Sequence, residues 1–262
     1  MNIGFIGAGN MGGALAEAIS RVSKTKVYIY DKNTEKSKTL ADKINACATT
    51  QEEVVQKSDF LFLGVKPNVL PEVAQEVGSI INSNTVIVCM AAGIQIEKIE
   101  KALNKKLPII RIMPNTPVMV GEGFTAYAKN ELVSDGKISE FENIMQFTGS
   151  LEPLEENAID SFCAVAGCGP AYAYMFIEAL AVGAEKCGIS RENAIRYAAK
   201  TVLGATLMTL KTNIDPKTLC KNVCSPGGAT IEGVKVLEER DFSNAVSSAI
   251  ESAFKRTKEL GK

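Results

Sequence analysis

The sequence contains no histidine, and it has almost no excess charge of either sign, because 29 Lys and Arg residues face 30 Asp and Glu residues. The absence of histidine excludes Ser-His-Asp and Cys-His catalysis, histidine general bases and histidine-ligated metals. A near-neutral chain without a cluster of Lys and Arg residues offers no positively charged surface to attract nucleic acid or an anionic membrane. We therefore expect no nucleic-acid partner and no membrane partner.

Cysteine spacing is equally restrictive. The seven cysteines are odd in number and form no C-x-x-C pair, which argues against a disulfide framework or a zinc site and predicts reduced thiols in a cytoplasmic protein. Cys220 and Cys224 are spaced to share one helix face, but zinc usually needs four ligands, so packing or chance is the simpler interpretation. The sequence predicts no metal site.

No targeting or membrane-spanning segment is expected. The N-terminus has no basic region followed by a long apolar stretch, so no secretory signal is predicted. The most apolar later stretch, residues 171–184, is interrupted by Glu178 and is shorter than the ~20 residues that span a bilayer. We expect it to be a helix buried in protein.

Up to about residue 150, short β-rich runs alternate with amphipathic segments, which is typical of βαβ units in a parallel sheet. The expected strands are residues 3–6, 27–30, 60–63, 85–88 and 109–113, and the expected helices include 34–43, 69–80 and 95–103. The fold class predicted is an α/β Rossmann-type N-terminal domain with a mainly parallel sheet.

After Glu152-Pro153 the pattern changes to long helical stretches, so we expect an all-α C-terminal domain and a boundary that gives domains 1–153 and 154–262. The helix 171–184 is apolar nearly all round, which requires cover on more than one side. A second subunit would supply that cover. The alternative is a helix at the centre of a monomeric bundle.

The residues Gly7-Ala8-Gly9-Asn10-Met11-Gly12 form a G-x-G-x-x-G string between the first expected strand, which ends at Ile6, and a helix. In this position the three glycines allow a tight turn, close approach of a pyrophosphate and close helix-sheet packing. The free amides and the dipole of the helix would then hold the phosphates. This context predicts a dinucleotide site.

Asp31 ends the second expected strand, where an acidic residue usually receives the adenosine ribose hydroxyls and favours NAD. The neighbouring Lys32, Asn33 and Lys36 could instead meet a 2'-phosphate, or they could belong to a solvated loop. The residues leave the choice between NADPH and NADH open, and we place NADPH slightly ahead.

Two other strand ends fall where an open α/β sheet places its ligand crevice. They carry Val65-Lys66-Pro67 and Ala91-Ala92-Gly93, and small side chains at the second would let a nicotinamide ring lie close to the backbone. The residues from Arg111 to Pro117 follow the next strand and contain two prolines, which imply a rigid turn whose role is as readily structural as functional.

The string Ser225-Pro226-Gly227-Gly228-Ala229-Thr230 interrupts the helical C-terminal part and leads into another helix. A Gly-Gly turn before a helix N-terminus presents free amides and the positive end of the dipole. Such a turn could hold a carboxylate. An ordinary connection between helices is the alternative.

With these motifs the chain resembles pyrroline-5-carboxylate reductase over essentially its whole length. The resemblance rests on the residues from Gly7 to Gly12, on Val65-Lys66-Pro67, on the residues from Arg111 to Pro117, on Gly169-Pro170-Ala171-Tyr172, and above all on the Ser225–Thr230 string. The family commonly has Ser where this chain has Ala166 and Cys168, which puts only details near the start of that helix in doubt.

The resemblance implies hydride transfer from NADPH, or NADH, to the C=N carbon of 1-pyrroline-5-carboxylate, which gives L-proline in proline biosynthesis. It implies that Ser225, Gly227, Gly228 and Ala229 bind the substrate carboxylate and that Thr230 hydrogen-bonds the ring nitrogen as the catalytic residue. It further implies Glu156 in the substrate pocket, Asn222 near the nicotinamide part of the cofactor, and a homodimer of helical domains that assembles into a larger homo-oligomer.

Two other functions are weighed against this one. A β-hydroxyacid dehydrogenase shares the architecture, but it needs a catalytic lysine where this chain has Ala171-Tyr172-Ala173. A non-catalytic dinucleotide sensor or scaffold would have no need of a second anion site. An already electrophilic imine needs positioning and a proton source more than a strong general acid, so a chain without histidine suits the reductase.

Overall fold

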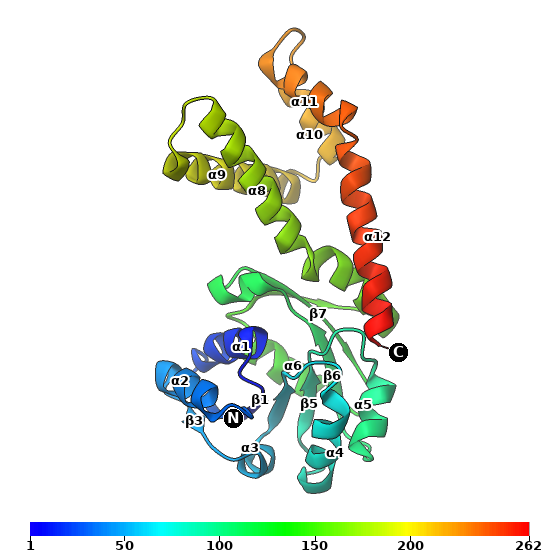
Figure 1. The fold of residues 1–262 in the computed structure, drawn as a ribbon. Coiled ribbons are helices and arrows are strands. Elements are labelled where there is room, and N and C mark those ends of the chain that lie inside the picture. Colours follow the sequence, from blue (N-terminus) through cyan, green and yellow to red (C-terminus); the bar gives the residue numbers. More distant parts are fainter. Residues whose placement is uncertain (262) are drawn as a thin grey trace. The chain divides into compact units, whose positions relative to one another are not determined.

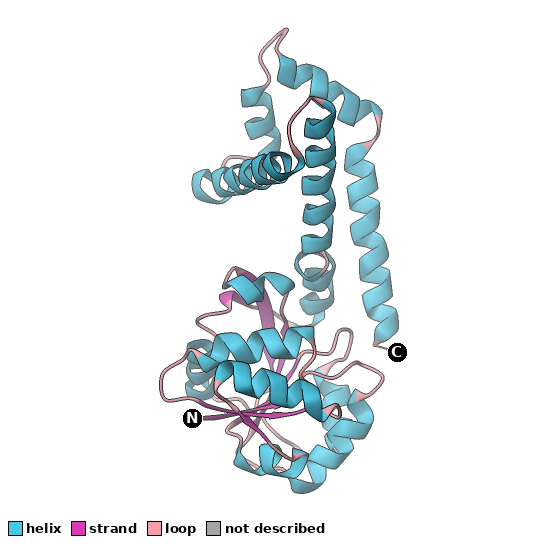
Figure 2. Cartoon of the chain, turned by 60° about the vertical axis from the view of Figure 1, so that its left-hand side comes forward, coloured by secondary structure: helices cyan, strands magenta, loops and turns pink. Residues whose placement is uncertain are grey.

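The computed structural model describes residues 1–261, and its contacts divide the chain into two compact units. Unit 1 comprises Met1–Cys168 together with the C-terminal segment from Ser252, and unit 2 comprises Gly169–Glu251. All strands lie in unit 1, whereas unit 2 is built of helices, as the magenta and cyan elements of Figure 2 show. The α/β N-terminal part and the all-α C-terminal part predicted from the sequence are confirmed.

The sheet of unit 1 has the strand order β3-β2-β1-β4-β5-β6-β7-β8 (Figure 1). The strands from β1 to β6 are parallel, β7 is antiparallel to β6, and β8 is parallel to β7. Their bounds are β1 Asn2–Ile6, β2 Lys26–Tyr30, β3 Cys47–Ala48, β4 Phe60–Leu63, β5 Val86–Cys89, β6 Ile109–Met113, β7 Gly123–Lys129 and β8 Gly149–Pro153. The order 3-2-1-4-5-6 is that of a Rossmann fold, whose ligand crevice lies beyond the carboxyl ends of the strands.

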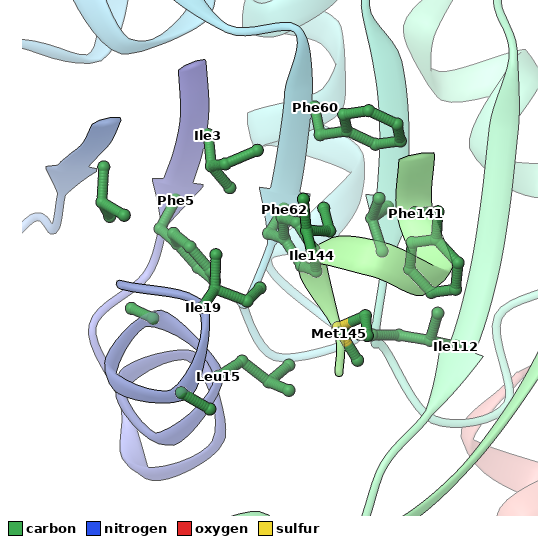
Figure 3. Packing of buried hydrophobic residues seen from close by; sticks show 14 of the residues in the cluster. Ile3, Phe5, Leu15, Ile19, Phe60, Phe62, Ile112, Phe141, Ile144 and Met145 are labelled. Carbon is green, nitrogen blue, oxygen red and sulfur yellow. The ribbon is translucent and has the colours of Figure 1, made fainter. Parts of the chain in front are cut away.

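Helices cover both faces of this sheet. One hydrophobic cluster joins it to α1 (Asn10–Ser20), α2 (Thr34–Ile44) and α6 (Asp135–Ile144), and a second joins it to α3 (Gln51–Lys57), α4 (Leu70–Ile80) and α5 (Ile96–Leu103). In the first cluster the rings of Phe5 and Phe62 stack with centroids 4.7 Å apart, and Leu15 and Ile19 of α1 lie beside them (Figure 3). This packing fixes the start of α1 against the ends of β1 and β4.

The five expected strands are all present, with ends shifted by no more than one residue, but the strands β3, β7 and β8 and the helices α3, α6 and α7 (Ile159–Phe162) were not expected. The strand β3 has only two residues, and β8 is exposed at three of its five positions, so neither carries a strong apolar pattern. The helices α3 and α6 begin after Thr50 and Ser134, whose hydroxyls accept hydrogen bonds from the first-turn amides of Glu53 and Lys137. Side-chain capping therefore starts both helices where hydrophobic periodicity is weak.

The expected boundary near residue 153 coincides with the end of β8, yet the contacts of unit 1 continue to Cys168. After β8 the chain forms the 3-10 helix η2 (Glu156–Ala158), α7 (Ile159–Phe162) and the π-helix η3 (Cys163–Gly167). Ile159 and Cys163 are buried against Met113 and Ala126 of the sheet. Where a domain that folds independently would end stays a prediction.

Unit 2 contains α8 (Gly169–Lys186), α9 (Arg191–Thr212), α10 (Pro216–Val223), α11 (Ala229–Glu239) and the first part of α12 (Phe242–Leu260). The helices α8 and α9 pack together, and the side chains of Ala181, Ala194 and Ala198 are buried. The Asp215 carboxylate caps α10 by accepting a hydrogen bond from the Thr218 amide at 3.1 Å.

The expectation that the helix 171–184 is buried in protein is wrong for the single chain, because Ala181 is the only buried residue of α8. The apolar helix is also longer than expected. Its helical residues run from Glu156 to Lys186, and this stretch is long and apolar enough to cross a membrane. Only 6% of the most apolar window is buried, and one such helix is weak evidence for a membrane. The alternative of a helix central in a monomeric bundle does not describe this chain.

Among the described residues, Arg111 of β6 has the largest fully buried side chain, and it lies in a strand whose other four residues are all apolar. Its Nη2 donates to Asp160 Oδ1 at 2.5 Å and its Nη1 to Glu156 Oε1 at 3.4 Å. Glu156 Oε1 also accepts the amide of Ile96, the first residue of α5, at 2.6 Å. One buried cation therefore ties β6, the segment after β8 and the start of α5 together.

We predict that Asp160→Ala lowers the free energy of unfolding by about 3–5 kcal/mol, because it leaves the buried Arg111 guanidinium without its shorter ion pair. Lys101→Ala, which removes an exposed ion pair with Glu97, is the matched control and should leave stability close to that of the parent. Urea unfolding followed by far-UV circular dichroism measures both. Equal midpoints for the two variants would contradict the prediction.

Candidate functional site

The Gly-rich string forms the turn between β1 and α1. Gly7 has φ +104°, and a Cβ there would lie 2.6 Å from the carbonyl oxygen of Gly64, while a Cβ on Gly12 would lie 2.3 Å from that of Gly7. A Cβ on Gly9, in contrast, would meet nothing within 4 Å. Gly7 and Gly12 therefore allow the close packing of the turn, and Gly9 leaves its outer side open.

The helix α1 begins after Gly9 without a side-chain cap. Its first amides, together with the positive end of the dipole, are available to an anion that approaches the open side of Gly9. Asn10 and Met11 form the first helical positions. These residues fit the pyrophosphate of a dinucleotide, because the turn leaves open space at Gly9, where any side chain would block the approach of the phosphates.

Asp31 lies just past the end of β2, as expected, but both of its carboxylate oxygens accept backbone amides. Oδ2 accepts from Ala8 at 2.7 Å and Oδ1 from Asn33 at 2.8 Å. The Asn33 side chain in turn caps α2 by accepting from the amides of Glu35 and Lys36. Asp31 therefore positions the Gly-rich turn, and the Asn33 side chain is engaged in the helix cap.

A cavity of about 220 Å³ lies beside Asp31, at the place where the adenosine half of a dinucleotide would bind. Ile6, Gly7, Val65 and Lys32 line it. Two carboxylates of α4, those of Glu72 and Glu76, line it as well. The lining thus combines one lysine with several acidic groups.

The other two expected strand ends meet the same edge of the sheet. The turn after β4 carries Val65, Lys66 and Pro67, and the Lys66 carbonyl accepts the amides of Val69 and Leu70 at 2.9 and 3.1 Å. The turn after β5 carries Ala91, Ala92 and Gly93. Unit 1 therefore brings together all the predicted cofactor residues between positions 6 and 93.

The sequence did not show why the loop after β5 requires a glycine. Gly93 has φ +76°, and a Cβ there would lie 2.5 Å from the carbonyl oxygen of Thr257 and 2.8 Å from the amide nitrogen of Gly261. Lys98 of α5 also donates to the Gly261 carbonyl. The C-terminal segment of the chain packs directly on this loop, so Gly93 is required by the protein's own backbone.

In unit 2, the Ser225–Thr230 string forms the turn between α10 and α11. The Ser225 carbonyl accepts the Gly228 amide at 3.0 Å, and Gly227 has φ +70°, a conformation that favours glycine. The helix α11 begins after Gly228 without a side-chain cap, and Ala229 and Thr230 are its exposed first residues. The turn therefore offers free amides to a carboxylate, and it places a hydroxyl in the same first turn.

Two other predicted site residues lie in different units of the chain. Asn222, expected near the cofactor, is on α10 of unit 2, three residues before Ser225. Glu156, expected in the substrate pocket, is in unit 1, where its Oε1 is shared by the Ile96 amide and Arg111.

Sequence reasoning missed Asp160, and it named Asn115 only as part of the string from Arg111 to Pro117. Asp160 lies four residues after Glu156 and holds Arg111. Asn115 donates to the Ala166 carbonyl at 3.0 Å and accepts the Phe124 amide at 2.9 Å, so it fixes the turn after β6. A buried arginine in an apolar strand was the signal available, since such a charge requires carboxylate partners.

Two family models match the chain. One, described as pyrroline-5-carboxylate reductase dimerisation, matches residues 156–260, and the other, described as NADP oxidoreductase coenzyme F420-dependent, matches residues 2–93. These ranges contain the Ser225–Thr230 turn and the Gly-rich turn respectively.

Relatives match over the whole length. Pyrroline-5-carboxylate reductase of Escherichia coli is 38% identical over 99% of this chain and 98% of its own length. The crystal structure of 1-pyrroline-5-carboxylate reductase from Streptococcus pyogenes has a TM-score of 0.91 at 31% identity and covers 99% of this chain and 98% of its own. That of Plasmodium falciparum pyrroline carboxylate reductase with NADP bound has a TM-score of 0.90 at 30% identity, with 100% and 98% covered. The chain belongs to the pyrroline-5-carboxylate reductase family.

Proposed function

We propose that the protein reduces 1-pyrroline-5-carboxylate to L-proline with NAD(P)H, as a step of proline biosynthesis. The observation that carries the proposal is a pair of anion seats at uncapped helix N-termini, one at α1 beside Gly9 and one at α11 beside Gly228. The first suits the pyrophosphate of the cofactor and the second suits a substrate carboxylate. The similarity of the chain over its full length to pyrroline-5-carboxylate reductases supports the assignment of the two sites to cofactor and substrate.

Each seat has a defined task in this proposal. The residues of the Gly-rich turn hold the cofactor, which supplies a hydride when bound. The first amides of α11, those of Ala229 and Thr230, hold the substrate carboxylate, which orients the ring. The Thr230 hydroxyl donates to the ring nitrogen, or relays a proton from water, as that nitrogen becomes an amine. Positioning and a proton source are sufficient, because a protonated imine is already electrophilic.

The activity and the role of Thr230 are tested in one assay, NAD(P)H oxidation followed by absorbance with and without 1-pyrroline-5-carboxylate. The parent protein should oxidise the cofactor only with substrate. Thr230→Val keeps the side-chain shape and removes one hydrogen bond to the reacting nitrogen. The stabilisation of the transition state should fall by about 1–3 kcal/mol, which lowers kcat/KM roughly 5- to 150-fold. Cofactor binding, measured by fluorescence titration, should not change.

Gly227→Val is the matched comparison, because it changes the shape of the turn and leaves the hydroxyl. A valine at φ +70° is strained, so the amides should no longer converge and the KM for the imine should rise. Full kcat/KM in Thr230→Val, with normal cofactor binding, would exclude Thr230 as the partner of the imine nitrogen. Ordered water would then be the proton source.

For the cofactor, we infer that both NADPH and NADH serve, with NADPH slightly ahead. Lys32, which lines the cavity beside Asp31, favours a 2'-phosphate, whereas the fixed carboxylate of Asp31 opposes it. Asp31→Ser should therefore shift the ratio of the two kcat/KM values toward NADPH. The ratio serves as its own control, because loss of the hydrogen bond from the Ala8 amide should weaken the binding of NADPH and of NADH equally. An unchanged ratio would remove Asp31 from the adenosine site.

For the assembly, we propose a homodimer formed through the helical part, which associates further into a larger homo-oligomer in the cytoplasm. The family model for residues 156–260 describes dimerisation. Within a single chain, large apolar side chains of α8 and α9 are exposed, among them those of Met175, Leu203 and Met208 at 71%, 50% and 51%. Apolar surface of this extent requires cover.

Multi-angle light scattering at micromolar concentration should therefore show at least twice the 28.0 kDa mass of the chain. Met175→Lys should shift the equilibrium toward the monomer, because it places a charge on the exposed apolar face of α8. Lys186→Met, at the end of the same helix, is the control, because it makes the opposite exchange and replaces a charged side chain with an apolar one. A stable monomer of the parent protein would contradict the proposal.

A further inference from the structure

The helix α10 carries two thiols immediately before the proposed carboxylate seat. Cys220 is exposed and Cys224 is partly buried, both are free thiols, and both line the same cavity. Cys224 is the C-cap of α10, and the next residue, Ser225, opens the turn. The pair is therefore adjacent in the chain to the residues that would bind the substrate.

The two thiols also share a cavity. A hollow of about 580 Å³ within unit 2 is lined by both cysteines, by Lys217 and Lys221 of the same helix, and by side chains of α11. A small oxidant that enters this hollow meets both cysteine residues. Cys89 and Cys163, in contrast, are buried. Burial raises the pKa of both thiols, that of Cys89 to about 11, and desolvation also raises the pKa of Cys224.

We propose that Cys220 and Cys224 form a redox modification site, at which a hydroperoxide links the two sulfur atoms into a disulfide that disables the carboxylate seat. This inference rests on the proposed function only for its effect on substrate binding. The formation of the link follows from the thiol pair itself.

The chemistry balances with hydrogen peroxide as the oxidant. The Cys220 thiolate attacks one peroxide oxygen, the O–O bond breaks, and Cys220 becomes a sulfenic acid while water leaves. The Cys224 sulfur then attacks the Cys220 sulfur, the S–S bond forms as the S–O bond breaks, and the departing hydroxide takes up the Cys224 proton and leaves as a second water. Two thiols lose two electrons and two protons, and one peroxide is reduced to two waters.

Closing the disulfide moves the turn. Residues four apart on a helix have Cβ atoms about 5–6 Å apart, whereas a disulfide holds them at about 3.5–4.5 Å. Cys224 has left the helical conformation, with φ −96° and ψ 94°, so it is the partner that can move. Ser225 moves with it, and Ser225 closes the turn by accepting the Gly228 amide.

The experiment treats the full-length protein with limiting hydrogen peroxide and measures mass, peptide map and kinetics. We expect a loss of two hydrogens in the intact mass and a Cys220–Cys224 link in the peptide map. The KM for 1-pyrroline-5-carboxylate should rise about tenfold or more, because the amides of the seat no longer converge. The KM for NADPH should be unchanged, and dithiothreitol should restore the parent values.

Cys220→Ser should keep the activity of the reduced enzyme and resist the effect of peroxide on KM. Cys187→Ser, which removes another exposed thiol, is the matched control and should remain sensitive. A link that maps elsewhere or joins two chains, an intact KM in the linked protein, or full sensitivity of Cys220→Ser would each overturn the proposal. Absence of reductase activity in the reduced parent would count against the proposed function alone, because the mass and the map still decide whether the thiols pair.

Discussion

The buried guanidinium of Arg111 is the constraint on which the crevice edge of unit 1 depends. A charge in an otherwise apolar central strand is tolerated only with close partners, and the two carboxylates that supply them come from the segment after the sheet. The Glu156 oxygen that faces Arg111 also accepts the first amide of α5. Because the loop of Ala91 to Gly93 leads into α5, the ion pair fixes the cofactor edge as well as the core.

The ion-pair network also explains why contacts of the sheet extend past its last strand. Asp160 and Glu156 lie on consecutive short helical turns, where a spacing of four residues brings both carboxylates to one side. Arg111 Nε has no hydrogen-bond partner among the described residues, so the two carboxylates supply all the compensation that the side chain receives. Neither carboxylate is free to act independently of the fold.

The sequence predicted the positions of the turns better than the partners of their side chains. The apolar runs of β1, β4 and β6 and the spacing of the glycines required a Rossmann crevice, and the structure has it. Asp31 was placed correctly at the end of β2, but periodicity could not show that the Ala8 and Asn33 amides would take both of its oxygens. The same holds for Gly93, whose neighbour is the C-terminal segment, more than 160 residues away in the chain. Contacts of that separation leave no local signal.

Unit 2 shows the opposite relation between pattern and structure. The apolar character of α8 requires cover on physical grounds, but the prediction of burial is wrong for the single chain, because α8 contributes only Ala181 to a buried surface. Small residues let α8 and α9 approach closely, yet they bury little area, and burial of area is the main source of stability. The free energy that holds these helices must therefore come largely from surfaces outside one chain. A seat built on α10 and α11 shares that dependence, because those helices have no buried residue of their own.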